Sequence, residues 1–191
     1  LEGRVAQPEA EWIERVAFSP SGLLTYACRG SVTIANSYDR GRVFPNPVGY
    51  ASVNDFALTR DESKLAVAYQ STTAVVFDLT ASPTKSVLLS GHKGKQVRAI
   101  GFTPDGRTVV TVGNDGTSRF WEATTGAALR VFEWGLGVLA TAAFAPDGLT
   151  CAAGSAIGCK RSCGGTGERS SVAARVKPLA VTRYLSVSGC W

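Results

Sequence analysis

Residues 91–122 read GHKGKQVRAIGFTPDGRTVVTVGNDGTSRFWE, and this stretch decides the fold. It contains three strand-like runs of alternating or β-branched residues, at 97–102, 108–112 and 118–121. The turns between them, Thr-Pro-Asp-Gly and Asn-Asp-Gly, consist of residues that tolerate the positive φ of a tight hairpin. The stretch therefore predicts an antiparallel meander of short strands.

The same pattern returns at a regular spacing along the chain. Each repeat has an apolar anchor at the end of its first predicted strand, and the four anchors are Phe18, Leu58, Phe102 and Phe144. They are 40, 44 and 42 residues apart, within the 40–45-residue period of repeats that form four strands each. An unrelated all-β sandwich would have to reach this regularity by chance.

The repeat at 91–122 resembles a WD repeat, one blade of a β-propeller. Three features carry the resemblance: the Gly91-His92 pair, the Phe-Thr-Pro-Asp-Gly turn, and Trp121-Glu122, where the family usually has Trp-Asp. The resemblance implies an all-β fold, a partial β-propeller of consecutive four-stranded antiparallel blades. We expect three full blades and one truncated blade, which do not form a closed ring on their own. The expected blades span about residues 13–45, 50–89, 91–132 and 137–155.

In this family a histidine, a hydroxyl residue, an aspartate and the tryptophan form a hydrogen-bonded chain. The matching positions here are His92, Thr111, Asp115 and Trp121. Such a chain is physically reasonable, because a buried carboxylate needs donors and a buried indole N–H needs an acceptor. The resemblance thus implies a structural role for His92, the only histidine of the chain, and not a catalytic or metal-binding role.

Charge and cysteine divide the chain in two. Residues 156–191 hold six basic residues and one acid, so the totals of 20 and 15 leave 14 bases and 14 acids in residues 1–155. The excess of positive charge is therefore confined to the tail, which argues against nucleic-acid binding by the repeats. Five cysteines form no disulfide framework pattern, and Cys159 and Cys163 lack two further ligands for zinc. No cofactor or metal site is expected.

The two ends of the chain follow no repeat. Residues 1–12 are interpreted as a linker or the start of a fragment, and residues 156–191 as a basic, irregular and poorly ordered tail. One hypothesis for the tail is a shift of reading frame between about Ser155 and Cys159. Permitted codons for residues 158–166, read in another frame, can encode an apolar strand ending in Trp-Asp near position 163, where the fourth repeat should have one. A genuine basic extension is the alternative.

A partner is expected on the rim where the first strands begin. Four residues before each anchor lie Glu14, Asn54, Arg98 and Ala140, and the three polar ones would form an arc on that rim. Trp134 either joins them as an exposed aromatic anchor or packs against a neighbouring blade. An open stack also leaves blade edges free, which favours self-association.

The function implied by the resemblance is a non-catalytic protein-interaction scaffold, and we expect the chain to be a fragment of a larger protein. No nucleophile, phosphate loop or carboxylate pair suggests an enzyme. The alternatives are a nucleic-acid-associated module acting through the basic tail, an enzyme with ligands in a central channel, and a degraded gene product without present function. The sequence shows no signal peptide and no membrane-spanning run, so a cytoplasmic location is the default expectation.

Overall fold

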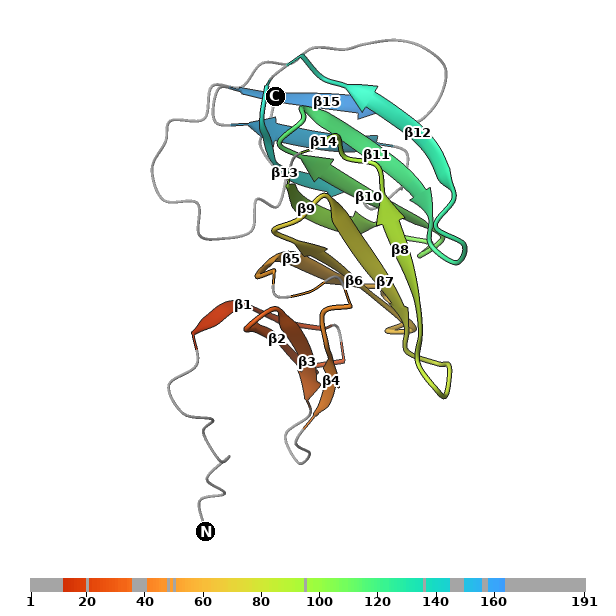
Figure 1. Cartoon of the computed structure of the whole chain (residues 1–191). Helices are drawn as coiled ribbons and strands as arrows, with labels where there is room; N and C mark the ends of the chain where they lie inside the picture. The colour runs from red at the N-terminus through yellow and green to blue at the C-terminus, as the bar shows by residue number, and fades with distance from the viewer. Residues whose placement is uncertain are drawn as a thin grey trace.

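The strands form four separate antiparallel sheets that follow one another along the chain (Figure 1). The computed structural model describes residues 12–19, 21–35, 41–47, 49, 51–94, 96–135, 137–144, 150–155 and 158–163. Blade 1, the first sheet, consists of β1 (Ile13–Phe18), β2 (Leu24–Cys28), β3 (Ser31–Ala35) and β4 (Arg42–Phe44). Blade 2 consists of β5 (Val53–Leu58), β6 (Lys64–Tyr69), β7 (Thr73–Asp78) and β8 (Lys85–Ser90). Blade 3 consists of β9 (Val97–Phe102), β10 (Thr108–Gly113), β11 (Thr117–Glu122) and β12 (Ala128–Glu133). Blade 4 consists of β13 (Leu139–Phe144), β14 (Thr150–Ser155) and β15 (Gly158–Cys163).

Within each blade the strands pair in sequence order, as a meander does. The inner strands β1, β5, β9 and β13 lie next to one another in that order. The described sheets remain separate and do not close into a ring. The prediction of an all-β chain of consecutive, unclosed blades is therefore confirmed. Among the described residues, none lies in a helix long and apolar enough to cross a membrane.

The fourth blade has one strand more than the sequence pattern indicated. The repeat signal ended at residue 155, yet β15 pairs with β14 from Gly158 to Cys163. The sequence missed this strand because its residues, Gly-Cys-Lys-Arg-Ser-Cys, show no apolar alternation, and the pairing uses backbone groups that any residue provides. The blade still has three described strands and not four. The expectations for residues 1–11 and for the tail beyond 163 lie outside the described residues.

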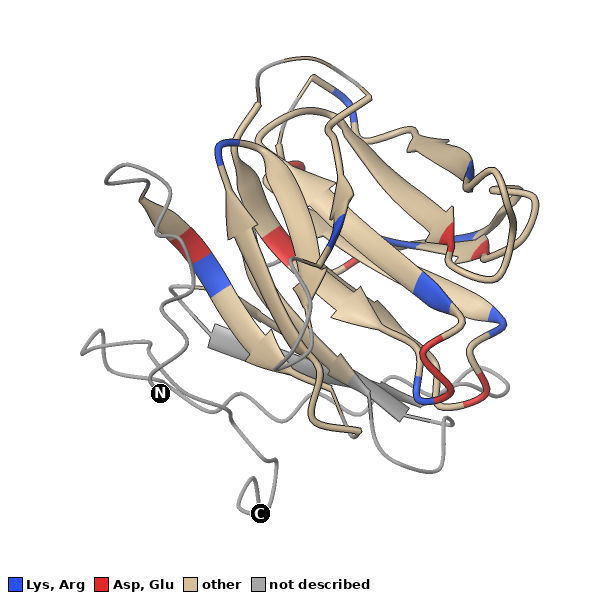
Figure 2. Ribbon diagram, turned by 90° about the horizontal axis from the view of Figure 1, so that it is seen from below, with Lys and Arg blue, Asp and Glu red and all other residues tan. Residues whose placement is uncertain are grey.

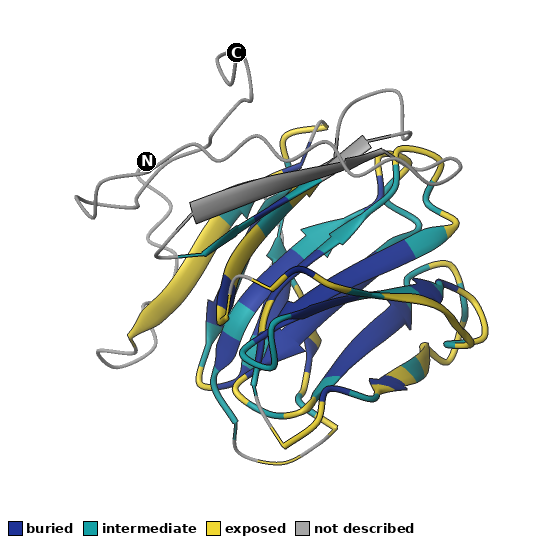
Figure 3. Ribbon diagram, turned by 90° about the horizontal axis from the view of Figure 1, so that it is seen from above, coloured by how far each residue is buried: buried dark blue, intermediate teal, exposed yellow. Residues whose placement is uncertain are grey.

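The hydrophobic core lies between the blades. The face of each blade that contacts the preceding blade, called here its receiving face, carries large side chains, in blade 2 Phe56, Leu65, Val67, Tyr69 and Phe77. The face that contacts the following blade, called its leading face, has small side chains on its inner strands, in blade 2 Ala66, Ala68 and Ala74. Large residues of one blade thus fill the space above the small residues of its neighbour, as close packing of a protein interior requires. Figure 3 shows this buried interior, with the exposed strand β1 at its edge.

A matched pair of alanine substitutions tests this packing. Ala68 is fully buried between blades 2 and 3, whereas Ala128 is exposed on the outer strand β12. Ala68→Leu is expected to lower the free energy of unfolding by about 1–3 kcal/mol, because the added methyl groups have no space to enter. Ala128→Leu is expected to leave it nearly unchanged. Urea unfolding of the two variants measures both values, and equal effects would contradict the proposed packing.

Candidate functional site

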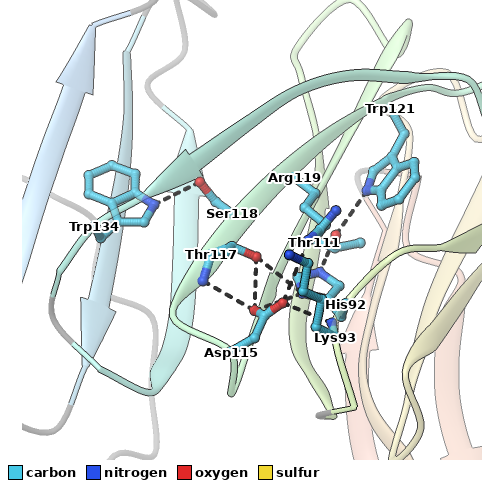
Figure 4. Close-up of polar contacts among 9 residues, drawn as sticks. All are labelled: His92, Lys93, Thr111, Asp115, Thr117, Ser118, Arg119, Trp121 and Trp134. Carbon is cyan, nitrogen blue, oxygen red and sulfur yellow. Dashed lines mark hydrogen bonds and ion pairs between the residues drawn. The ribbon is translucent and has the colours of Figure 1, made fainter.

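Blade 3 contains a continuous chain of buried hydrogen bonds (Figure 4). Trp121 Nε1 donates to Thr111 Oγ1 at 2.9 Å, and Thr111 Oγ1 lies 2.8 Å from His92 Nε2. The other ring nitrogen of His92, Nδ1, lies 3.0 Å from Asp115 Oδ1. The structure thus brings together the four residues that the family resemblance singled out. They come from the loop before β9, from β10, from the turn after it and from β11.

One arrangement of protons satisfies every member of this chain. Because Thr111 Oγ1 accepts from the indole, its own hydrogen is free to be donated to His92 Nε2. His92 Nδ1–H then donates to the Asp115 carboxylate. Burial lowers the pKa of His92 below its usual value, which favours this neutral imidazole. Burial raises the pKa of Asp115, but the hydrogen bonds from His92 and Thr117 outweigh it and leave the pKa lowered.

Asp115 also fixes the turn between β10 and β11. Its Oδ1 accepts from the backbone N–H and the hydroxyl of Thr117, at 3.1 and 2.8 Å, and its Oδ2 accepts from the N–H of Lys93 at 3.2 Å. A Cβ on Gly113 would lie 2.5 Å from His92 Nδ1, so the imidazole requires glycine there. The sequence pattern alone did not single out Thr117 or Gly113. All of these contacts hold the blade together, and none leaves the imidazole free to react with a ligand.

The proposed rim residues share one backbone feature. In each blade a single residue of the first strand is skipped in the pairing with the second strand, and these residues are Glu14, Asn54, Arg98 and Ala140. Such β-bulges redirect a side chain out of the regular ladder. Glu14 Oε2 accepts from the N–H of Val53 at 2.7 Å, and Asn54 Nδ2 donates to the carbonyl of Val97 at 2.6 Å. Glu14 and Asn54 therefore lie next to the start of the following blade, and Arg98 and Ala140 occupy the same position in their own blades.

Two expectations for the rim need correction. Glu14 and Asn54 are engaged in the inter-blade bonds just described, so only Arg98 of the three polar residues is both exposed and outside such a bond. Trp134 is not an exposed anchor, because only 7% of it is accessible. It packs with Leu139 and Ala153 of blade 4, and its Nε1 donates to Ser118 Oγ at 2.7 Å. The large apolar body of tryptophan is thus buried between blades 3 and 4, with its polar atom satisfied.

Asp55 joins three blades and was not identified from the sequence. Its Oδ1 lies 2.9 Å from Arg15 Nε of blade 1, and its Oδ2 accepts from the N–H of Ile100 in blade 3 at 3.1 Å. The N–H of Phe56 also donates to Oδ1, at 2.8 Å. Burial raises the pKa of Asp55 to about 6, although Arg15 and the two N–H groups lower it in part. Desolvation of the carboxylate is therefore the larger effect.

The described residues offer no site of obvious chemistry. No group of three or more His, Cys, Asp or Glu side chains among them could hold a metal ion. Basic and acidic residues are interspersed over the described strands and turns in the view of Figure 2. The arrangement can therefore support specific contacts on a rim, and its buried polar groups serve the fold.

Comparison with known proteins agrees with the geometry. The family model "WD domain, G-beta repeat" matches residues 79–122, which run from the end of β7 through β8 and the first three strands of blade 3. A chain in the crystal structure of the Mitotic Checkpoint Complex superimposes with a TM-score of 0.73 over 85% of this chain, at 19% identity. Residues 79–122 are therefore similar to a WD repeat, and the chain as a whole has the fold of consecutive propeller blades.

A curated relative matches over a shorter stretch. The ribosome biogenesis protein ERB1 of Yarrowia lipolytica (strain CLIB 122 / E 150) is 47% identical over 53 residues, which are 27% of this chain. The chain spans 6% of the length of that relative and 51% of the matched checkpoint-complex chain. Fifty-three residues are little longer than one WD repeat, so this match shows the repeat and not the process named for the relative.

The hydroxyl of Thr111 is expected to be essential to the stability of the third WD repeat. Thr111→Val keeps the shape but leaves the indole N–H of Trp121 and the Nε2 of His92 without partners. Each unsatisfied buried group costs about 1–3 kcal/mol, so the free energy of unfolding should fall by about 2–6 kcal/mol. Thr108→Val, the same change in the same strand but outside the hydrogen-bonded chain, should cost much less. Similar losses in the two variants would show that the chain of hydrogen bonds is not stabilising.

Asp55 is expected to make stability depend on pH. Its pKa is about 6 in the folded chain and about 3.9 when unfolded, so the folded state holds the proton more tightly. Its contribution to stability is complete below pH 4 and is lost as the pH rises through 6, a change of about 3 kcal/mol. The difference in unfolding free energy between wild type and Asp55→Asn should fall by that amount from pH 4 to pH 8. The titration of His92 also changes stability with pH, but it does so equally in both proteins and therefore cancels in this difference.

Asp105→Asn provides the control for this pH dependence. Asp105 is exposed on a turn, and hydrogen bonds from Thr103 and Arg107 lower its pKa. An acid with a lowered pKa stabilises the fold at higher pH, so the difference for this variant should be small and of the opposite sign. A flat profile for Asp55→Asn, or the same sign for both variants, would contradict the assignment.

Proposed function

We propose that this chain is a non-catalytic protein-interaction module of WD repeats and a segment of a larger propeller protein. The observation that carries the proposal is that the polar residues able to supply chemistry are used to hold the fold together. His92, Asp55 and Asp115, which could supply chemistry, are engaged in bonds within or between blades. The exposed side chains of Lys93, Arg98 and Val138 instead lie near the starts of the first strands β9 and β13. The short spans of the chain relative to its matched proteins support its being a segment.

The rim near blades 3 and 4 is the proposed contact surface. Arg98 stands on the bulge of β9, Lys93 lies in the loop before that strand, and Val138 immediately precedes β13; all three are exposed. This mixture of arginine, lysine and an apolar side chain can dock an acidic segment of a partner protein that also carries an apolar residue. Arg98 is the residue most suited to a directed contact, because its guanidinium can bind a carboxylate with two hydrogen bonds.

Charge reversal on the rim tests the proposal. The wild-type chain, Arg98→Glu and Arg130→Glu are compared as baits in quantitative affinity capture from cells. Arg130 is the matched control, since it is exposed on the outer strand β12. We expect proteins that bind wild type and Arg130→Glu, but bind Arg98→Glu at least about tenfold less, a change of about 1.4 kcal/mol. Equal capture by all three baits would contradict the rim as the contact surface. No enrichment over an unrelated bait would favour a product without present function.

The basic tail supports nucleic-acid binding as a second candidate function. The support for this function is that residues 156–191 hold six basic residues and only one acidic residue. This function requires binding of single-stranded RNA or duplex DNA that weakens at least about tenfold between 50 and 200 mM salt, because phosphate contacts release counterions. It also requires that binding is lost in a chain ending at residue 155. Salt-independent binding, or binding retained by the shorter chain, would exclude this candidate.

A further inference from the structure

The outer strands β4, β8 and β12 are the outer edges of blades 1 to 3 (Figure 1), and these edges differ in how well they are protected. An edge strand offers its backbone N–H and C=O groups to any extended segment, and proteins guard such edges by shortness, by proline or by a β-bulge. β4 has only three residues and is followed by Pro45. β12 contains a bulge, because Leu129 is skipped in the pairing with β11.

The edge of β8 has none of these protections. β8 pairs with β7 without a bulge in six consecutive residue pairs, from Lys85 with Asp78 to Ser90 with Thr73. Among the described residues, no strand pairs with its other side and no further backbone–backbone hydrogen bond reaches residues 85–90. Every second residue of an antiparallel edge strand directs its N–H and C=O away from the neighbouring strand. β8 is thus a regular edge with backbone donors and acceptors available for pairing.

The two faces of β8 differ in exposure. On the face toward blade 3, Leu89 is buried in the core between the blades, and the turn between β11 and β12 approaches Val87 closely. On the opposite face Ser86, Leu88 and Ser90 are exposed, Leu88 to 53%. A strand added to this edge therefore meets one large apolar side chain at its centre, with a small polar side chain on either side.

The charge around β8 indicates the chemistry of the segment that fits this edge. Residues 79–104 contain four basic residues and no acidic residue. Two of the basic residues are exposed near the ends of β8, Lys85 at its start and Lys93 in the loop that follows it. Asp78 lies opposite Lys85 on β7, but its carboxylate accepts two hydrogen bonds from Thr80. An acidic segment is attracted here, whereas a second copy paired edge to edge would bring like charges together.

We propose that β8 accepts an extended acidic segment of a partner protein as an additional strand of blade 2. Backbone hydrogen bonds with β8 supply the affinity, and side chains supply the selectivity. An apolar residue of the segment packs on Leu88, and acidic residues near its ends pair with Lys85 and Lys93. This surface shares Lys93 with the rim proposed above but does not need Arg98, so the two contacts can be tested separately.

Selection from a displayed library of random peptides tests the proposal, with the full 191-residue chain as bait. Peptides of about ten residues are long enough to run along β8. We expect the selected peptides to alternate apolar and polar residues and to carry an excess of acids. Leu88→Lys, which places a charge on the edge, and Lys85→Glu should each weaken their binding at least about tenfold. Val131→Lys is the matched control, because Val131 has the corresponding position on the bulged strand β12 and is 47% exposed.

Hydrogen exchange separates strand addition from a contact made by side chains alone. A bound peptide should slow the exchange of amides in β8 and leave those of β12 unchanged, because only β8 gains backbone hydrogen bonds. Binding without this added protection overturns the proposal. So does a selection that yields no peptide, or binding that Leu88→Lys leaves intact. If Leu88→Lys does not fold, Lys85→Glu decides in its place.

Two further outcomes assign the binding elsewhere. Peptides that lose binding in Arg98→Glu but not in Leu88→Lys contact the rim, which supports the proposed function and overturns the strand addition. Self-association of the chain that Leu88→Lys abolishes indicates pairing between two β8 edges, and it overturns the acidic partner segment.

Discussion

The structure depends on one constraint, that a blade can bury its large apolar face only against its neighbour. A single twisted sheet of four short strands has no core of its own, and the three core clusters lie between consecutive blades. The alternation of large receiving faces and small leading faces follows from this constraint. It also explains why β1, unlike the inner strands β5 and β9, is exposed along most of its length, because no described blade packs on its outer side.

Polar bonds complement this packing in two different ways. Blade 3 has the internal chain from Trp121 to Asp115, which fixes its own strands. Blades 1 and 2 lack that set and are joined across their junction. The backbone N–H of Ser21 donates to Glu62, the guanidinium of Arg42 donates to the carbonyl of Leu79, and Arg15 pairs with Asp55. Blades 1 and 2, which lack the internal hydrogen-bonded chain, are thus held together by polar contacts with each other. Removing a bond of the internal chain leaves a buried polar group unsatisfied, whereas the Ser21–Glu62 and Arg42–Leu79 bonds are exposed.

The sequence predicted the parts of this arrangement that depend on local pattern. Anchor spacing predicted the blades, and the resemblance singled out four residues that the structure brings together in blade 3. The sequence did not predict Asp55, because a polar residue in a strand looks solvent-exposed until the blades on both sides are known. It did not decide whether Trp134 is exposed on the rim or buried, since the burial of an aromatic side chain in a loop depends on how the next blade packs. It missed β15, whose pairing uses the backbone and leaves no side-chain pattern.

The central claim is that the stability of each blade comes from its neighbours. Hydrogen exchange measured by mass spectrometry on the dilute, monomeric chain tests this claim most directly, because it reports the opening free energy of each strand. Blades 2 and 3 have neighbours on both faces, so the account expects their strands β6, β7, β10 and β11 to exchange most slowly. The strands β1–β3 and β13–β14 should open at distinctly lower free energy. Equal protection of all four blades, or slowest exchange in blade 1, would contradict the account.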